Sequence, residues 1–399
     1  MRQNLKKIEK KIKKINKPIA LVLGRYITSG LGTSRGLGTQ NIPVFWFDSA
    51  SKQGGFLSKY CTGVLCPDLT INKTEYVEFL IRFGSMLSQK GVLFPIGDSE
   101  ALIILKNKNK LKKYYHIPMA DYNITEILIN KQKFYSTLEK QGINYPKTYM
   151  PIDKTDVKNI SKEIKYPCIL KPANSEYFRR AFNKKFFLAK SNKQLLENYD
   201  NAISKNLNMM IQEIIPGNAR FMYGFNSYYD KSFTPNGAFV YRRIREWPPT
   251  SGNGVFIEKY DKPELEKIIT HLIKKIKFHG IIDAEFKIDE RNGELKLIEI
   301  NPRCWMQIGF LLKHGINLPH MAYLDALGQN FDNLYLDKNQ VKWVYMLHDI
   351  PSAFHEIKKH NLSFGQWIQS YKGKKIYAIF SWNDPLPFFR SISKINYTY

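Results

Sequence analysis

An acidic stretch near the end of the third quarter of the chain constrains the fold more than any other segment. Residues 281–303 read IIDAEFKIDERNGELKLIEINPR. Apolar and polar residues alternate on both sides of Arg291-Asn292-Gly293, and a glycine at this place suits a left-handed turn position. The stretch therefore predicts a β-hairpin over residues 281–300, with one apolar face and one face that carries carboxylates.

Two registers of this hairpin are open. With a three-residue loop, Glu285 stands opposite Glu299, and Asp283 stands opposite Asn301. A two-residue Asn-Gly loop instead sets Glu299 opposite Phe286, although it pairs the residues near the turn better. A one-residue bulge in the first strand would reconcile the two. Burial of the apolar residues favours the first register for the end away from the turn.

The first register gathers three carboxylates and an amide oxygen on one face, within about 5–7 Å of one another. Like charges that face each other destabilise a hairpin unless a cation joins them. Ligands that are all oxygen atoms select a hard cation, and Mg²⁺ is the usual one beside phosphates. The alternative is a solvated face whose carboxylates are balanced by surface lysines.

The N-terminal part of the chain has a different sequence pattern. Apolar runs at Ile19–Gly24, Val44–Asp48 and Gly91–Pro95 each end at turn residues, and Ala101–Leu111 has a helical pattern. Such an alternation of strands and helices predicts a small, doubly wound, Rossmann-like α/β unit over residues 18–122.

A glycine-rich turn is expected after the first of these strands. Gly30, Gly32 and Gly36 loosely resemble a dinucleotide-binding fingerprint, with Asp48 at the end of the next strand. The spacing departs from G-x-G-x-x-G, and glycines that allow a helix to pack closely on a strand are the alternative. A Rossmann dehydrogenase built on this turn would leave the acidic hairpin unexplained.

The remaining elements are read from apolar periodicity and turn residues. They are a helix at about 124–141, strands at Cys168–Pro172 and Met209–Ile215, a hairpin over 221–229 and 237–243, a helix over 263–277, and a smaller C-terminal unit with a helix near 352–360.

The formal net charge is +26. It indicates either lysines spread over solvated faces or attraction to an anionic partner such as a nucleotide, an acidic substrate, nucleic acid or a lipid surface. Residues 1–17 are basic, and we expect a frayed, solvated extension; the alternative is an amphipathic helix in peripheral contact with an anionic membrane. No helix-turn-helix, zinc-finger or RNP pattern occurs, so nucleic acid is not an expected partner.

Four scattered cysteines form neither a zinc motif nor a disulfide framework, and no run of 18 or more apolar residues is present. These features predict a reducing, cytoplasmic location, with contact through residues 1–17 as the route to a membrane surface.

Short motifs along the chain resemble those of the ATP-grasp superfamily. The run Glu299-Ile300-Asn301-Pro302-Arg303, at the end of the paired acidic strands, resembles the metal-binding signature of that family. Asn130-Lys131 is similar to its first nucleotide lysine, and Ile169-Leu170-Lys171-Pro172 to its second. Gln212-Glu213-Ile214-Ile215 resembles the hinge that holds adenine. The motifs follow in the family order over about residues 18–330.

The resemblance implies a fold of mixed α/β and α+β class. Its parts are a basic extension over 1–17, a Rossmann-like pre-ATP-grasp domain over 18–122, an ATP-grasp domain over 123–330 with a lid subdomain at about 146–217, and a small C-terminal subdomain over 331–399.

The resemblance also implies site residues and cofactors. ATP and Mg²⁺ are the expected cofactors, with Mn²⁺ as a substitute ion. The metal ligands would be Glu285, Glu299 and Asn301. The nucleotide would be held by Lys131, Lys171, Gln212, Glu213, Ile214 and Ile215. Basic residues near the transferred phosphate and the substrate would be Arg242, Arg243 and Arg303.

A closer resemblance is to uncharacterised ATP-grasp carboligase-like proteins and to D-aspartate ligase. It is carried by Tyr241-x3-Arg245-x2-Pro248-Pro249 and by the C-terminal tail. The implied function is an ATP- and Mg²⁺-dependent carboxylate–amine or carboxylate–thiol ligase that forms an acyl phosphate, with small carboxylates such as amino acids as substrates. Bicarbonate or an ammonia equivalent are further acceptors. The alternative outside this class is a non-catalytic protein that binds ATP or anions at a nucleic-acid or membrane surface. The oligomeric state is open.

One segment departs from the family pattern. Residues 173–190 contain no glycine, where many members have a glycine-rich loop over the phosphates. Arg179, Arg180, Lys184 and Lys185 occur there instead, and they form either a cationic clamp or an ordinary solvated loop. Candidate wall residues of the substrate pocket are Ser99, Glu100, Trp247 and Trp305, with core packing as the alternative for the tryptophans.

Overall fold

The computed structural model describes residues 8–172, 178, 181–249, 252–331 and 340–393. By its internal contacts the chain forms two compact units. The first unit comprises Met1–Thr125, Gly224–Asp283 and Asn301–Tyr399, and the second unit comprises Glu126–Tyr223 and Ala284–Ile300. All four cysteines are free thiols. None of the helices in the described ranges combines the length and apolar character needed to cross a bilayer.

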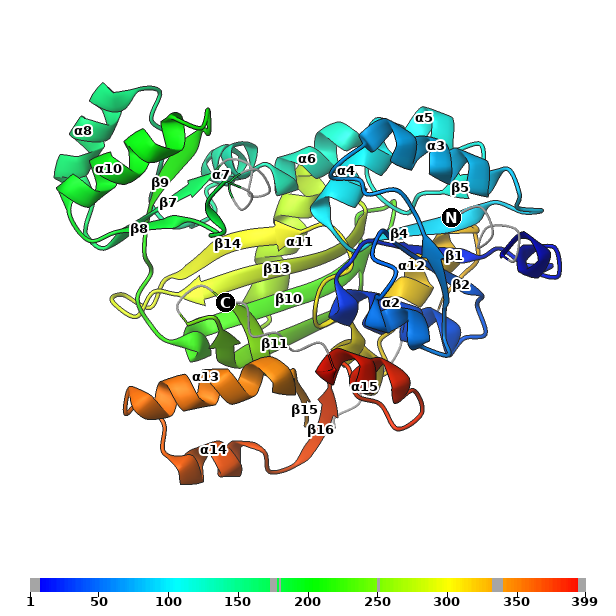
Figure 1. Ribbon diagram of the computed structural model, residues 1–399. Coiled ribbons are helices and arrows are strands. Elements are labelled where there is room, and N and C mark those ends of the chain that lie inside the picture. The colour runs from blue at the N-terminus through cyan, green and yellow to red at the C-terminus, as the bar shows by residue number, and fades with distance from the viewer. Residues whose placement is uncertain (1–7, 173–177, 179–180, 250–251, 332–339, 394–399) are drawn as a thin grey trace. The chain divides into compact units, whose positions relative to one another are not determined.

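A five-stranded parallel sheet organises the N-terminal part of the first unit (Figure 1). Its order is β3-β2-β1-β4-β5, so the chain runs outward from β1 to one edge and then returns to the other side of β1. This is the predicted doubly wound arrangement, with its switch point between β1 and β4. The strands are β1 (Ala20–Leu23), β2 (Val44–Asp48), β3 (Thr62–Leu65), β4 (Gly91–Pro95) and β5 (Tyr115–His116).

Helices cover both faces of this sheet because its strands are apolar on both sides. On one face, Leu31 and Leu37 of α2 pack against Val22 and Trp46. The apolar side chains of three further helices pack on the other face, where strand residues such as Leu21 and Phe45 point. The helices are α2 (Ile27–Gly38), α3 (Lys73–Gly84), α4 (Asp98–Lys106) and α5 (Lys108–Leu111).

The predicted glycine-rich turn is wrong, because Gly30, Gly32 and Gly36 lie inside α2. A Cβ atom on Gly30 would fall 2.0 Å from the ring of Trp46, and one on Gly32 would fall 2.7 Å from the backbone nitrogen of Gly309. These glycines therefore let the helix approach its neighbours closely, which was the alternative to a dinucleotide fingerprint.

The N-terminal stretch also differs from the expectation of a frayed extension. Residues 8–12 are helical, and Ile8 and Ile12 are 4% and 2% exposed within the same core as Leu80 of α3. Their apolar side chains are covered by protein, so they are not available to a membrane. Leu5, on the same expected helical face, lies outside the described residues.

A seven-stranded sheet of order β14-β13-β10-β11-β12-β15-β16 forms the second sheet of the molecule. Residues after 340, predicted as a smaller C-terminal unit, add its last two strands and belong to the first unit. The strands are β10 (Met222–Tyr229), β11 (Pro235–Trp247), β12 (Asn253–Lys259), β13 (Gly280–Ile288), β14 (Leu295–Asn301), β15 (Val341–Val344) and β16 (Lys374–Tyr377).

The remaining helices of the first unit lie between and after the strands of this sheet in the sequence. The predicted amphipathic helix is confirmed as α11, which buries Leu265, Ile269, Leu272 and Ile273. Near the C-terminus, Asp384 accepts hydrogen bonds from Arg35 and Ser58 at 2.9 and 2.7 Å, which ties the tail to the N-terminal part of the same unit. The helices are α11 (Glu264–Ile276), α12 (Leu318–Ala326), α13 (Met346–Lys358), α14 (Phe364–Ser370) and α15 (Leu386–Ile392).

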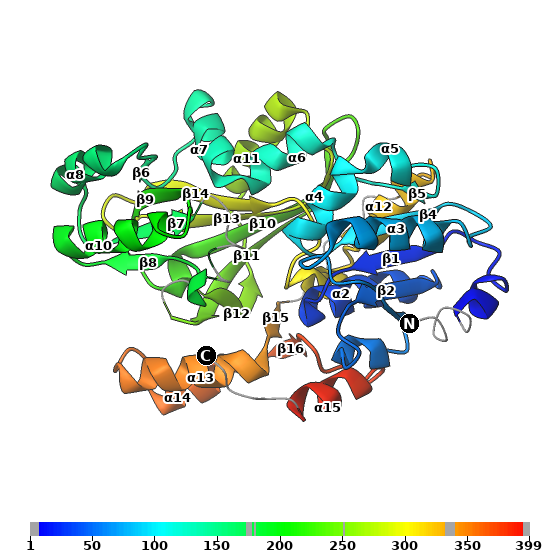
Figure 2. The ribbon, with the colours of Figure 1, turned by 45° about the horizontal axis from the view of Figure 1, so that its top comes forward.

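A four-stranded antiparallel sheet of order β6-β9-β7-β8 forms the centre of the second unit (Figure 2). Two helices share its core, and side chains such as Val157, Leu195 and Tyr199 pack on its strand residues. The elements are β6 (Thr148–Tyr149), α8 (Lys154–Glu163), β7 (Cys168–Pro172), β8 (Phe187–Ala189), α10 (Asn192–Ile203) and β9 (Met209–Glu213).

The helix expected over 124–141 is two helices, α6 (Tyr122–Ile129) and α7 (Lys131–Lys140). The break lies at Asn130, whose backbone is extended and whose side chain accepts hydrogen bonds from the backbone of Gln132 and Lys133. Asparagine is a favoured N-cap because its side-chain oxygen satisfies such free N–H groups. A new helix therefore begins at Lys131, the predicted nucleotide lysine.

The hairpin at residues 281–300 is confirmed as β13 and β14, but both predicted loops are wrong. The backbone N–H of Asp289 donates to the carbonyl of Glu294 at 2.8 Å, which leaves four residues, 290–293, in the loop. Gly293 has a φ of 75°, the left-handed conformation that the sequence predicted for it. Away from the turn, Asn301 donates to the Asp283 carboxylate at 3.1 Å, as the first register predicts.

Candidate active site

Four of the predicted site residues lie together in the second unit. Lys131 begins α7, Lys171 lies on β7, and Glu285 and Glu299 lie on β13 and β14. The Lys131 Nζ atom is 3.6 Å from a carboxylate oxygen of Glu299. Burial, and then the positive charge of Lys131, lower the pKa of Lys171 to about 8, while Glu299 and Glu285 oppose this shift. The structure thus brings both lysines to the two carboxylates.

These four side chains suit a metal-bound polyphosphate. Two ammonium groups that disfavour each other's charge would both be stabilised by an anion with several oxygen atoms. The two carboxylates offer only oxygen atoms, which is the donor type that Mg²⁺ prefers, and this ion usually keeps water and phosphate oxygens as its other ligands. In the described part of the chain no three His, Cys, Asp or Glu side chains gather as metal ligands. The residues therefore fit a shared protein–phosphate metal site rather than a closed cage.

Tyr135 is a residue of this cluster that the sequence analysis missed. It lies one helical turn after Lys131, and its hydroxyl donates to the carbonyl of Ile298 on β14 at 2.9 Å. Its ring stacks on Tyr145 with centroids 5.5 Å apart, and burial raises its pKa. Tyr135 therefore fixes the helix that carries Lys131 to the strand that carries Glu299. The i, i+4 spacing of Lys131 and Tyr135 was the available signal.

The predicted adenine hinge follows β9. Gln212 is buried, and its side-chain nitrogen donates to the Thr148 hydroxyl at 2.7 Å. Ile215 is buried and Ile214 is half-buried. The side chain of Gln212 is thus already engaged within the sheet, and a nucleotide role for it stays a prediction.

Glu213 is held by an ionic network at the base of the hairpin. Its carboxylate accepts hydrogen bonds from Arg291 at 2.8 Å, from Lys296 at 2.9 Å, and from the backbone of Lys147 at 2.8 Å. Burial alone would raise the pKa of Glu213, but these hydrogen bonds outweigh it and lower the pKa. Its carboxylate therefore has a structural role, and its backbone N–H is engaged as well, since it donates to the carbonyl of Lys147 at 3.0 Å. A role of Glu213 in binding adenine stays a prediction.

In the first unit, Asp283 orients the predicted ligand Asn301. Asp283 is 2% exposed and accepts hydrogen bonds from Asn226 at 2.8 Å and from Asn301 at 3.1 Å. Its own carboxylate is thereby occupied, although the sequence analysis counted it with the clustered acidic groups. The amide nitrogen of Asn301 points to Asp283, and its amide oxygen accepts a hydrogen bond from Arg303 at 3.0 Å, so its role as a metal ligand stays a prediction.

Arg303 is fixed by two acceptors. Its Nε donates to Asp98 at 2.5 Å and its Nη2 donates to the amide oxygen of Asn301 at 3.0 Å. Asp98 begins α4 directly after β4, and the sequence analysis did not assign it to the site. Residues that follow the carboxyl ends of parallel strands meet at one edge of a sheet, and this rule was the missed signal.

Arg242 and Arg243 point to opposite faces of β11 and have separate partners. Arg242 donates to Glu258 on the adjacent strand at 2.6 Å. Arg243 is 3% exposed and donates to the carbonyl of Gly252 at 3.1 Å and to Glu246 at 3.2 Å. These contacts hold both guanidinium groups in place, and their role beside the transferred phosphate stays a prediction.

The glycine-free segment is described only in part. The positive charge of Lys185 contributes to the lowered pKa of Lys171, so Lys185 lies near the cluster. Arg179 and Arg180, predicted with it as a cationic clamp, lie outside the described residues. Of the candidate wall residues, Trp305 is 2% exposed within the core of the first unit, as its alternative reading expected.

Comparison with known proteins gives one curated relative by sequence. The D-aspartate ligase of Enterococcus faecium (strain Aus0004) is 32% identical over 267 residues, which cover 63% of this chain and 63% of the relative. The chain thus spans less than two thirds of that ligase. No family profile matches the chain.

Solved structures with the same fold are numerous. N5-carboxyaminoimidazole synthetase from Staphylococcus aureus complexed with ADP has a TM-score of 0.65 and 16% identity, covering 86% of each chain. Biotin carboxylase from Campylobacter jejuni has a TM-score of 0.63 and 15% identity, covering 80% of this chain and 74% of its own. L-amino acid ligase from Bacillus licheniformis has a TM-score of 0.60 and 16% identity, covering 78% and 75%.

The predicted mixed α/β and α+β fold is confirmed by these structures. At 15–16% identity the structures show the fold alone, whereas the sequence relative links the chain to ligases that the motifs already resembled. The chain therefore shares the fold of these structures and is similar in sequence to a D-aspartate ligase over 63% of its length.

Proposed function

We propose that this protein is an ATP- and Mg²⁺-dependent ligase that activates a small carboxylate as an acyl phosphate and joins it to an amine. The observation that carries the proposal is the cluster of Lys131, Lys171, Glu285 and Glu299 in the second unit. Two lysines and two carboxylates gathered in one place match what a metal–nucleotide complex needs. If the four groups only stabilised the fold, two separate ion pairs would be the simpler arrangement.

The two lysines bind and orient the phosphates. Lys131 lies at the N-terminus of α7, where the helix dipole adds to its attraction for anions. Lys171 is partly neutral in the free protein near pH 8, and a bound polyphosphate would favour its charged form. Mg²⁺ would be held by Glu285, Glu299 and Asn301. Of these, Glu299 and Asn301 both lie on β14, two positions apart. Bound Mg²⁺ would neutralise charge on the phosphate oxygens.

The guanidinium groups serve the carboxylate. Arg303, held by Asp98 and Asn301, would bind the substrate carboxylate and the acyl phosphate made from it. Arg242 or Arg243 would stabilise the transferred phosphoryl group. The hinge residues Gln212–Ile215 would hold adenine, mainly through backbone groups. No side chain of the protein has to form a covalent bond to the substrate. The catalysis would therefore come from positioning of the reactants and from electrostatic stabilisation.

The names of two similar proteins suggest the substrate class. One is a D-aspartate ligase and another is an L-amino acid ligase. An amino acid is therefore the first candidate for the activated acid, and a primary amine is the first candidate for the nucleophile. A thiol, bicarbonate or ammonia as acceptor would give a different product from the same acyl phosphate. Mn²⁺ is expected to replace Mg²⁺ in the assay.

The test measures ADP release across amino acids and small carboxylates, alone and in pairs with amines. Hydroxylamine in place of the amine traps an acyl phosphate as a hydroxamate. Glu299→Gln is expected to lower ADP release by about 10²-fold or more, since it removes a charged ligand, with unchanged folding. Glu294→Gln is the matched control, because Glu294 is exposed on the same hairpin.

Two outcomes would contradict the proposal. Turnover that survives in Glu299→Gln would remove the metal assignment. A wild-type protein that binds ATP, retains nucleic acid or anionic vesicles in a salt-dependent manner and releases no ADP with any pair would instead be a non-catalytic binding protein.

A further inference from the structure

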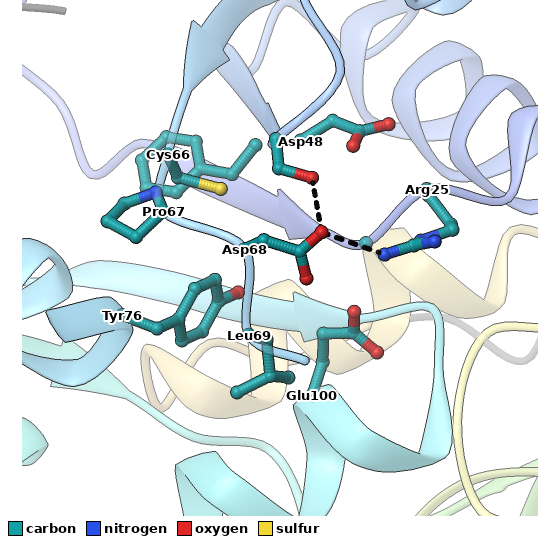
Figure 3. A pocket seen from close by; sticks show the side chains of 11 residues that line it. Arg25, Asp48, Cys66, Pro67, Asp68, Leu69, Tyr76 and Glu100 are labelled. Carbon is teal, nitrogen blue, oxygen red and sulfur yellow. Dashed lines mark hydrogen bonds and ion pairs between the residues drawn. The ribbon is translucent and has the colours of Figure 1, made fainter. Parts of the chain in front are cut away.

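A small pocket lies at the carboxyl edge of the five-stranded sheet, within the first unit (Figure 3). The pocket is small and partly open to solvent, so it suits one polar group of a ligand rather than a whole small molecule. Arg25 follows β1, Asp48 ends β2, Asp68 follows β3, and Glu100 lies in the first turns of α4 after β4. In doubly wound sheets, ligands bind at this edge, near the switch point.

The charges of this pocket are unbalanced. Three carboxylates line it against one guanidinium, that of Arg25, which is 3.5 Å from Asp68 and has a side chain that is 55% exposed. Asp68 also accepts hydrogen bonds from the hydroxyls of Thr70 and Ser49. An excess of carboxylate in a confined space attracts a cation.

Tyr76 gives a second, independent indication of a ligand. It lies on α3, is 3% exposed, and its buried hydroxyl has no hydrogen-bond partner among the residues that the structure describes. In Figure 3 this hydroxyl points into the space between Asp68 and Glu100. Buried polar groups are nearly always hydrogen-bonded, and an unpaired one that faces a pocket is explained by a bound group.

The side chain of Glu100 completes the arrangement. Burial raises the pKa of Glu100 to about 7, and the nearby Asp98 adds to this shift, while Arg303 and Arg25 oppose it. Asp48 and Asp68 face the same pocket as further negative groups, and the Cys66 thiol stays neutral because burial raises its pKa. A cation in the pocket would therefore favour the ionised form of Glu100.

We propose that this pocket binds the primary ammonium group of a ligation substrate, held by Tyr76, Glu100 and Asp68. The proposal rests on the proposed ligase function. A primary ammonium has three N–H donors and no acceptor, and these three groups offer acceptor oxygens around one space. A metal ion fits less well, because the described residues hold no group of three His, Cys, Asp or Glu side chains spaced as metal ligands.

Two substrates of an amino-acid ligase carry such a group. One is the amino acid that is activated, through its α-ammonium, and the other is the attacking amine. The hydroxylamine assay separates them, because hydroxylamine is neutral at pH 7.5 and needs no ammonium site. With D-aspartate and hydroxylamine the KM reports the acid, and with D-aspartate and methylamine the second KM reports the amine.

Tyr76→Phe and Glu100→Gln are the test variants. Each is expected to raise the KM for one of the two ammonium substrates about tenfold, the effect of one lost hydrogen bond to a charged group. Tyr149→Phe and Glu78→Gln are the matched controls, since Tyr149 is a half-buried tyrosine of the second unit and Glu78 is exposed on α3. Both controls are expected to keep the wild-type KM values.

Two further readouts exclude a merely structural role. Tyr76→Phe is expected to keep or raise the Tm, because it deletes a hydroxyl without a partner. Ammonium binding to the wild type is expected to strengthen as the pH rises through about 7, the pKa of Glu100, and Glu100→Gln is expected to lose this dependence.

The possible failures are distinguishable. If both test variants release ADP with unchanged KM values, the pocket proposal is overturned, and the proposed ligase function still stands. If no pair supports ADP release, the proposed function fails, and calorimetry with D-aspartate and N-acetyl-D-aspartate then decides. If D-aspartate binds, N-acetyl-D-aspartate does not, and Tyr76→Phe weakens the binding about tenfold, the ammonium site is supported even though the ligase reaction is not. Equal binding of both compounds, or none, would overturn the site.

Discussion

Replacing Glu100 by glutamine should change how the stability of this protein depends on pH. Glu100 is an acid whose folded-state pKa is raised from its ordinary 4.5 to about 7, chiefly by burial. In the unfolded chain the carboxyl loses its proton at about pH 4.5, whereas in the folded chain it keeps the proton until about pH 7. Folding therefore becomes less favourable as the pH rises between these values, and glutamine abolishes this loss.

The magnitude follows from the two pKa values. They differ by about 2.5, and one pKa unit corresponds to about 1.36 kcal/mol, so the free energy of unfolding falls by about 3 kcal/mol between pH 4.5 and pH 8. Glu100→Gln should thus match the wild type near pH 4.5 and exceed its stability by up to about 3 kcal/mol at pH 8.

The assay compares urea unfolding midpoints of the two proteins at pH 5 and pH 8, with Glu78→Gln as the exposed-carboxylate control. Groups that titrate in both proteins cancel in the difference. The same stability difference at both pH values would refute the reasoning, because it would mean that the Glu100 carboxyl ionises in the folded state as it does in water. An unchanged control together with a growing difference would support it.

Two further changes test the packing that supports the site. Gly30→Ala should lower the free energy of unfolding by about 1–3 kcal/mol, because its Cβ would fall 2.0 Å from the Trp46 ring, and denaturant unfolding would show it; a neutral effect would contradict the close approach. Asp349→Ala should cost about 3–5 kcal/mol, since it leaves Arg245, only 5% exposed, without its paired carboxylate at 2.6 Å, and a Tm within a degree of the wild type would contradict this.

Local patterns predicted the elements that carry the proposed nucleotide-binding residues. Cys168–Pro172 is a buried strand with one lysine, and β7 has these bounds. A short apolar run between proline and polar residues has few other solutions, so its type and its ends were both predictable. The acidic hairpin was predictable for the same reason, because alternation over two runs joined by Asn-Gly specifies two paired strands.

The loop of that hairpin was not predictable from turn preferences. Asp289 is nearly fully buried and binds both Arg291 and Lys296, which also reach Glu213 on β9. This network joins residues about 80 positions apart in the sequence. Its charge pairing outweighs the preference of Asn-Gly for a two-residue loop, and four residues form the loop instead.

Glycines gave an ambiguous signal for a physical reason. A glycine serves equally where the backbone must turn and where two elements must approach closely. In α2 the approach decides, since Trp46 occupies the space that a side chain on Gly30 would need. The partner ring lies on another strand, so the sequence around Gly30 contains no evidence of it.

The pocket of the first unit was missed because its residues come from four separate segments. Arg25, Asp48, Asp68 and Glu100 each follow a different strand of one parallel sheet or end it. Glu100 was considered only as a wall residue. Listing the polar residues at every strand end, once the sheet order is known, would have brought them together.

The net charge of +26 does not decide the function, because the groups that could act on substrates are local. In the second unit, burial and the positive charge of Lys131 lower the pKa of Lys171, and a bound polyphosphate would favour its charged form. In the first unit, the pocket is lined by three carboxylates, of Asp48, Asp68 and Glu100, and by one guanidinium, of Arg25. A bound cation would offset this excess of negative charge. A binding protein for nucleic acid would need only the first kind of site. The proposed ligase, which would take both a nucleotide and an ammonium substrate, would need both kinds.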